Sequence, residues 1–192
     1  MRNHSVTHLD PRLPLVLDTS SLPRQPGAMR TVHRVVSAPA DLGVAMIGVA
    51  EGSDLQLDLR LESVSEGVLV SGTVSATATG ECSRCLRPIS VQLEVVSQEL
   101  FAYPDSTTDA TTEDDEVGRL QGDLIDLEQT VRDAVVLALP TSPLCREDCP
   151  GLCPRCGAHW DDLPADHRHD ERVDPRWEVL KQLKLTEDRT EE

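Results

Sequence analysis

The sequence predicts an α+β protein: an antiparallel β meander or small open barrel packed by one long helix, then a zinc-knuckle segment and a short helix. Three observations lead to it. Apolar residues alternate with a period of two over 55–101, a helical repeat covers 123–139, and six cysteines stand in short paired spacings. The length of 192 residues suits one domain. We expect that domain over 12–185, with 1–11 a flexible N-terminus and 186–192 a charged tail.

The composition limits both the core and the partners. Apolar residues make up 39% of the chain but aromatic residues only 2%, so Val, Leu, Ile and Ala must build the core, and metal crosslinks would be a useful supplement. The formal net charge of −16 opposes non-specific binding to RNA or DNA and favours basic protein partners. The Arg and Ala bias suggests a bacterial host.

Neither a membrane span nor a signal peptide is evident. No apolar run approaches the ~20 residues that a membrane helix needs, and the polar N-terminus shows no signal-peptide pattern. We therefore predict a cytoplasmic protein whose cysteines are reduced thiols or metal thiolates. The alternative is a secreted protein with three disulfides.

The first half of the chain predicts strands. Residues 12–18 predict a short edge strand, 19–32 a loop, and 33–50 short, ambiguous strands. The clearest alternation follows, with a turn at 65–67, and predicts at least three antiparallel strands. The alternating apolar residues are Leu55, Leu57, Leu59, Leu61, Val68, Val70, Val74, Ala76, Ala78, Ile89, Val91, Leu93 and Val95.

The second half predicts an acidic loop and two helices. Residues 104–119 are acidic without apolar periodicity and predict a solvated, mobile loop. Residues 123–139 predict the long helix, capped by Asp123 or Asp126 and ended by Pro140. Its apolar stripe, which we expect to pack on the sheet, consists of Leu127, Val131, Val135 and Leu139. Residues 174–185 predict a short closing helix with Asp174 as its cap and Trp177, Leu180 and Leu183 as its stripe.

The cysteines predict metal sites. A Cys-x-x-Cys turn points two thiolates at one centre, and four such ligands form a tetrahedral zinc site. In the second cluster Pro154 presets φ within the turn, and Gly157 can take the positive φ that lets backbone amides face the sulfurs. The Cys/His segment covers 145–173. The cysteines are Cys82, Cys85, Cys145, Cys149, Cys153 and Cys156.

Two ligand arrangements are open. In the first, Cys82/Cys85 join Cys145/Cys149 in an all-cysteine site, and Cys153/Cys156 join His167/His169 in a second site. In the second arrangement, the four cysteines of the later cluster share one zinc, and the first pair stays free. We favour the first because it closes a longer loop and gives the early pair a role. Iron is an alternative metal for an all-cysteine site.

The chain carries no pattern typical of an enzyme. Closed cysteine-rich sites are structural, whereas a catalytic zinc keeps an open position. The sequence contains no His-Glu-x-x-His, no Gly-rich phosphate loop and no Gly-x-Ser-x-Gly. We predict no catalytic residue. The alternatives are a thiol- or metal-dependent enzyme, such as a nuclease or an oxidoreductase using Cys82 and Cys85, and a general protein-interaction module.

The order of these features resembles the YceD family of bacteria and plastids, a domain of unknown function described as a large-subunit ribosomal RNA accumulation protein. The resemblance runs from about residue 12 to residue 185. The segments that carry it are Glu81–Pro88, Asp123–Leu127, Leu137–Pro140, Cys145–Gly157 and Asp174–Trp177. Many members have a further Cys-x-Cys where this chain has His167 and His169. Histidine is a competent replacement ligand, and the alternative is that the second site is lost and both are surface histidines.

The resemblance implies a role in ribosome biogenesis, as a non-enzymatic factor that supports accumulation of the large ribosomal RNA. The expected cofactor is zinc. The expected partner is a ribosomal RNA precursor, a basic ribosomal protein or an assembly factor. The candidate contact residues flank the cysteines and are Arg84, Arg87, Arg146 and Arg155. The alternative, that these arginines offset thiolate charge or are solvated, is the one we favour.

Overall fold

The computed structural model describes residues 9–104, 106–112, 117–169 and 176. The chain forms two compact units, residues 1–149 and residues 150–192. The first unit holds the sheet, and the described part of the second holds a cysteine–histidine loop with the short 3₁₀ helix η1, Trp160–Asp162. The expectation of a single domain over 12–185 stays a prediction.

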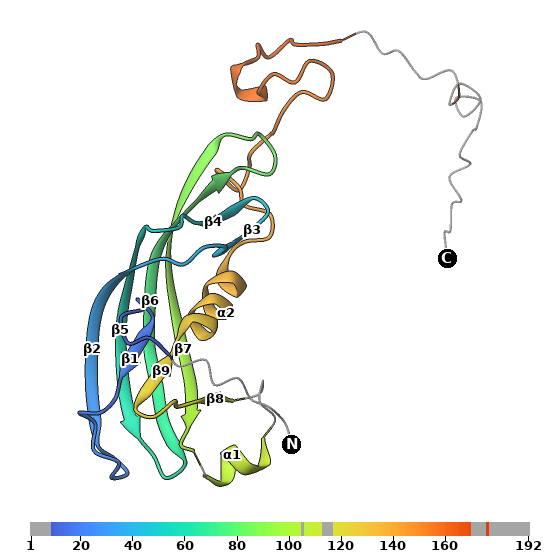
Figure 1. Cartoon of the computed structure of the whole chain (residues 1–192). Helices are drawn as coiled ribbons and strands as arrows, with labels where there is room; N and C mark the ends of the chain where they lie inside the picture. Colours follow the sequence, from blue (N-terminus) through green and yellow to red (C-terminus); the bar gives the residue numbers. More distant parts are fainter. Residues whose placement is uncertain (1–8, 105, 113–116, 170–175, 177–192) are drawn as a thin grey trace, which may run out of the picture. The chain divides into compact units, whose positions relative to one another are not determined.

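The first unit is built on a largely antiparallel sheet (Figure 1). Its described strands are β1 Val16–Asp18, β2 Met29–Ser37, β3 Gly43–Val44, β4 Ile47–Val49, β5 Asp54–Ser63, β6 Gly67–Glu81, β7 Pro88–Ala102, β8 Gly118–Arg119 and β9 Leu124–Asp126; its helices are α1 Thr107–Thr111 and α2 Glu128–Ala138. Seven strands form the main sheet in the order β2-β5-β6-β4-β3, with β7 on the other side of β6 and β8 beside β7. Strands β1 and β9 form a separate pair.

The predicted meander is confirmed. Strands β5, β6 and β7 are consecutive and antiparallel, with Leu57 opposite Val74 and Val74 opposite Val95. Alternation therefore places one apolar side chain from each strand at the same level of one face. Among the described residues the sheet stays open, since β2 at its far edge pairs only with β5.

The core lies on one face of this sheet. Leu55, Leu57 and Leu61 of β5 are fully buried, and burying each stabilises the fold by roughly 1.5–3 kcal/mol. Helix α2 runs beside β7 (Figure 1) and turns Val131 and Val135 into the same cluster. The apolar stripe expected to pack on the sheet is thus buried as predicted.

Two predicted boundaries were wrong, and both errors have tertiary causes. Strand β2 begins at Met29, inside the segment predicted as a loop, because all its residues find partners on β5. Helix α2 begins at Glu128, not at residue 123, because residues 124–126 pair with β1 instead. The N-cap residue is Leu127, which makes no side-chain cap bond, so neither predicted aspartate caps the helix; Asp126, one residue earlier, accepts a hydrogen bond from the Glu128 amide at 2.9 Å.

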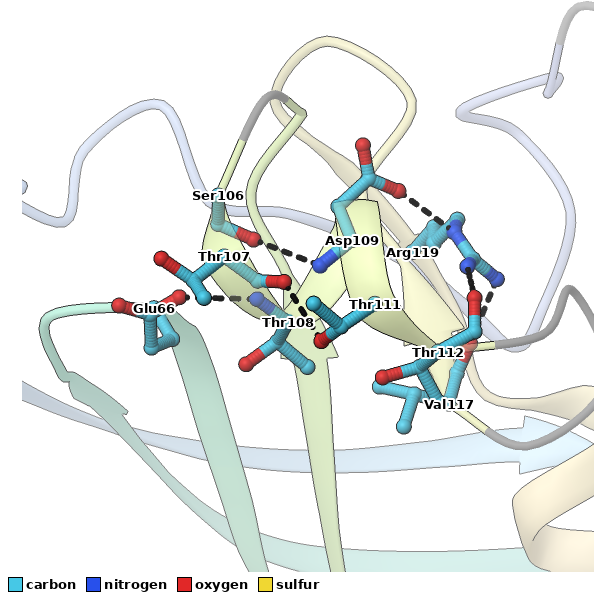
Figure 2. A network of polar contacts seen from close by, with 9 residues as sticks. All are labelled: Glu66, Ser106, Thr107, Thr108, Asp109, Thr111, Thr112, Val117 and Arg119. Carbon is cyan, nitrogen blue, oxygen red and sulfur yellow. Dashed lines mark hydrogen bonds and ion pairs between the residues drawn. The ribbon is translucent and has the colours of Figure 1, made fainter.

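The described part of the acidic segment contains the helix α1, where the sequence predicted a loop over 104–119; the predicted mobility stays a prediction. Ser106 caps α1 by accepting a hydrogen bond from the Asp109 amide. Arg119 donates to the Asp109 carboxylate at 2.7 Å and to the Thr112 carbonyl at 2.9 Å. Figure 2 shows this network, in which Glu66 also accepts from the Thr108 amide. The network ties Arg119 of β8 to the α1 segment, and β8 itself pairs with the end of β7.

Two further predictions concern the closing helix and a membrane span. The closing helix over 174–185 lies outside them except for residue 176. Within the described part of the chain, no helix has the length and apolar character needed to cross a membrane.

Candidate metal centres

The first cysteine pair lies in the loop that connects β6 to β7. The Cys82 amide donates to the Arg87 carbonyl at 2.9 Å, and the Leu86 amide donates to the Cys82 carbonyl at 2.8 Å. Leu86 takes a φ of 61°, the left-handed conformation that closes the turn. Both cysteines of this loop are buried.

The segment that follows α2 packs against this loop within the same unit. The Ser83 amide donates to the carbonyl of the buried Pro143 at 2.8 Å. The Arg84 guanidinium donates to the Cys149 carbonyl at 3.0 Å. These two bonds join the β6–β7 loop to residues far along the chain. They bring Cys145 and Cys149 close to Cys82 and Cys85.

Four sulfurs converge there, from Cys82, Cys85, Cys145 and Cys149, all within 4.8 Å of one another. The Cys82–Cys149 and Cys85–Cys145 sulfur distances are 3.8 and 3.7 Å. A tetrahedron with metal–sulfur bonds of about 2.3 Å has an edge of about 3.8 Å, whereas a disulfide is about 2.05 Å long. All six cysteines are free. The set therefore fits a tetrahedral metal ion.

The sulfur environments also favour metal binding. Burial opposes ionisation of Cys82, but hydrogen bonds from the amides of Cys145, Cys85 and Arg84 lower its pKa to about 6. Its neighbour Cys149 raises the pKa of Cys145 to about 12, with burial adding to the effect. Four thiolates this close repel one another, and a divalent cation removes that repulsion by replacing the thiol protons.

Cys153 and Cys156, in the second unit, lie on a turn with the same pair of backbone hydrogen bonds as the Cys82–Cys85 turn. The Gly157 amide donates to the Cys153 carbonyl at 2.8 Å, and the Cys153 amide donates to the Ala158 carbonyl at 2.7 Å. Gly157 has a φ of 72°, as predicted. Hydrogen bonds from the amides of Cys156 and Arg155, opposed by burial, lower the pKa of Cys153 to about 6.

Two histidines complete this second set. The Nε2 atom of His169 lies 3.3 Å from the Cys153 sulfur, and that of His167 lies 3.7 Å from the Cys156 sulfur. All four ligand atoms lie within 4.8 Å of one another. A mixed sulfur–nitrogen tetrahedral edge is about 3.6 Å, from metal bonds of about 2.3 and 2.0–2.1 Å. Trp160 packs edge-on against His167 and holds its ring in place.

The described residues thus group as in the first of the two arrangements considered. The pair Cys82/Cys85 meets Cys145/Cys149, and Cys153/Cys156 meets His167/His169. The arrangement in which all four later cysteines share one ion is not formed among the described residues.

The four candidate arginines have different surroundings. Arg84 holds the Cys149 carbonyl, and Arg146 forms an ion pair with Asp148 at 3.0 Å. Arg87 is half-buried at the end of the first loop, and Arg155 is exposed in the second. Arg84 and Arg146 each have a partner within the first unit, and a contact role for the four arginines stays a prediction.

Sequence patterns missed two features of the first centre. Leu86 directly follows the first Cys-x-x-Cys, as Gly157 follows the later one, and both have a positive φ. This shared position was the only sequence signal for the positive φ of Leu86. The bond from Ser83 to the Pro143 carbonyl joins distant segments and has no local signal.

These features define a class: a β-sheet protein with two Cys/His sets that could each hold a metal ion. The family model described as "Large ribosomal RNA subunit accumulation protein YceD" matches residues 70–184, and the chain belongs to this family.

Relatives from several bacteria are similar to this chain over most of their length. The uncharacterized protein Rv2926c of Mycobacterium tuberculosis is 55% identical over 170 residues, which cover 88% of this chain and 81% of the relative. The uncharacterized protein ML1660 of Mycobacterium leprae is 46% identical, with 87% and 76% covered. YlbN of Bacillus subtilis is 28% identical, with 71% and 77% covered. No solved structure matches the chain.

Proposed function

We propose that this protein is a non-enzymatic, zinc-binding factor of the bacterial cytoplasm that supports accumulation of large-subunit ribosomal RNA. The family match supports the ribosomal role. The observation that carries the structural part is the closure of both ligand sets, each with four protein donors. A set with four protein donors offers no open position for a substrate or an activated water.

Zinc is the metal that suits both sets. An all-cysteine tetrahedron accepts zinc or iron, whereas two cysteines with two histidines are typical of structural zinc. The same protein therefore needs only one kind of metal if that metal is zinc.

The thiol-oxidoreductase alternative has less support. A redox Cys-x-x-Cys pair keeps one sulfur accessible at the start of a helix. Here Cys82 and Cys85 lie buried in a strand-to-strand loop, beside two further sulfurs. We assign the pair to metal binding.

The test is depletion of the protein in its host, followed by measurement of both ribosomal RNAs. A fall in large-subunit RNA with small-subunit RNA spared, restored by the wild-type chain, is the expected result. Restoration by a Cys149→Ser chain at equal protein level would contradict the role of the four-sulfur centre. Unchanged RNA ratios after depletion would refute the ribosomal role itself.

A further inference from the structure

A groove of about 760 Å³ lies between β7 and α2 in the first unit. One wall comes from the C-terminal half of β7 and includes Ser97 and Glu99. The other comes from α2 and includes Asp133 and Leu137, and Gly118 of β8 also lines the groove. None of these residues belongs to either metal centre, so the groove is a separate feature of the sheet.

The β7 wall of this groove is a sheet edge. Along one side, β7 pairs with β6 from Pro88 to Ala102. On its other side, the described residues provide a partner only at Phe101 and Ala102, where β8 runs parallel. Residues 88–100 thus present backbone amides and carbonyls without a strand beside them, and such an edge is a template for an added strand.

The groove is negatively charged. Among the described residues that line it, Glu99, Asp126 and Asp133 are acidic and none is Lys, Arg or His. Glu99 lies on the core-facing side of β7, where alternation would place an apolar residue. Burial raises the pKa of Glu99; a hydrogen bond from the Gly118 amide partly opposes this, and the nearby Asp133 adds a smaller upward effect.

The rim of the same groove is apolar. Val96 on β7 and Leu137 on α2 are 79% and 85% exposed, and both line the groove. Val96, like Glu94, lies on the face of β7 opposite Glu99, so an apolar side chain flanks the strand edge on that face, while Leu137 and the carboxylates flank it on the α2 side.

We propose that this groove binds an extended segment of a basic protein, which adds a strand to the open edge of β7 in line with β8. Lysine or arginine side chains of that segment meet Glu99 and Asp133, and the alternate, small apolar side chains cover Val96 on the opposite face of β7. Main-chain bonds supply affinity, and the alternating side chains supply specificity.

Charge distinguishes this occupant from two others. RNA is repelled, because its phosphates would face the carboxylates of the groove. A second copy of this chain is also disfavoured, since edge-to-edge pairing would bring together acidic residues of two chains that each carry a net charge of −16. An inward acidic residue on an edge strand rejects self-pairing and accepts a basic partner.

This partner extends the proposed function, but its test needs no ribosomal RNA measurement, so the two can fail separately. The full chain, labelled with ¹⁵N, is titrated with a peptide of about eight residues in which valine and lysine alternate. We expect amide shifts concentrated on residues 94–100 of β7. The double variant Glu99→Gln, Asp133→Asn should weaken binding about tenfold, as two partly exposed charge pairs imply.

Matched controls make the result specific. Glu94→Gln removes a charge from the same strand on the opposite face, and it should leave affinity within about twofold. A peptide of equal charge with proline at alternate valine positions cannot pair along the edge, and on the wild-type chain it should bind at least about tenfold more weakly. This peptide comparison holds even if the double variant is poorly folded.

Several outcomes would overturn the proposal. These are shifts away from β7, equal binding of the proline peptide, or an equal effect of Glu94→Gln. A single-stranded RNA that shifts the same amides would assign the groove to RNA. Broadening of the β7 signals with chain concentration, in the absence of peptide, would assign it to a second copy.

Discussion

Removal of one sulfur from the four-cysteine centre should destabilise the first unit by about 4 kcal/mol. The centre joins Cys85 to Cys145, which lie 60 positions apart in the chain. A metal that crosslinks these residues lowers the conformational entropy of the unfolded chain. For a loop of this length, that effect stabilises the folded state by about 4 kcal/mol. For a protein of this size, each kcal/mol shifts the melting temperature by about 2–4 °C, so the expected fall is about 8–16 °C.

The assay is thermal unfolding of the full chain, followed by circular dichroism, for wild type and Cys149→Ser with and without a zinc chelator. Cys149 is 2% exposed, so serine also buries a hydroxyl. Chelation of the wild type separates the metal effect from that substitution. The two perturbations should not add, because each removes the same crosslink.

The matched control is Cys156→Ser. Its sulfur belongs to the second set, whose ligands all lie in the second unit. The sheet transition should therefore keep its melting temperature. The reasoning is refuted if the wild type loses its metal to the chelator and the sheet still melts within about 2 °C of its original temperature.

Three further predictions follow from the same geometry. Reduced protein never exposed to chelator should contain about two zinc ions per chain by elemental analysis, at four ligands each; a metal-free, fully folded protein would contradict this. Leu86→Gly should stabilise the first loop by about 0.5–1 kcal/mol in urea unfolding. A leucine in the left-handed conformation is strained by about 1–2 kcal/mol, and the greater entropy of glycine in the unfolded chain offsets part of the gain from removing that strain. Since the folded-state pKa of Glu99 is raised above 4.5, its ionised form destabilises the fold. Glu99→Gln should therefore be more stable than wild type at pH 7, with the difference lost as the pH falls through the raised folded-state pKa and absent below 4.5; a pH-independent difference would argue against this charge effect.

Local patterns predicted the elements whose contacts are close in sequence. The alternation of leucines in β5 and the return of β6 and β7 follow from a period of two with one buried face. The turn after Cys153 was predictable in detail, since proline and glycine specify its backbone dihedral angles.

Patterns failed where a distant partner decided the outcome. Residues 124–126 continue a helical apolar repeat, yet they form β9, because β1 supplies strand partners for them. The segment from Met29 has a loop-like neighbourhood, yet β5 pairs with it along its whole length. Arg119 likewise orders part of an acidic segment whose composition indicates a loop.

The sequence by itself determined the strand and helix periodicities, the tight cysteine turns and the donor types that suit a metal, because each depends on residues a few positions apart. Only the tertiary structure decided which pairs share a centre. Cys82 and Cys85 meet Cys145 and Cys149 because the β6–β7 loop packs against the segment after α2, through the carbonyls of Pro143 and Cys149. The structure also decided that, among the described residues, one side of β7 has a strand partner only at Phe101 and Ala102, which no local residue pattern reveals.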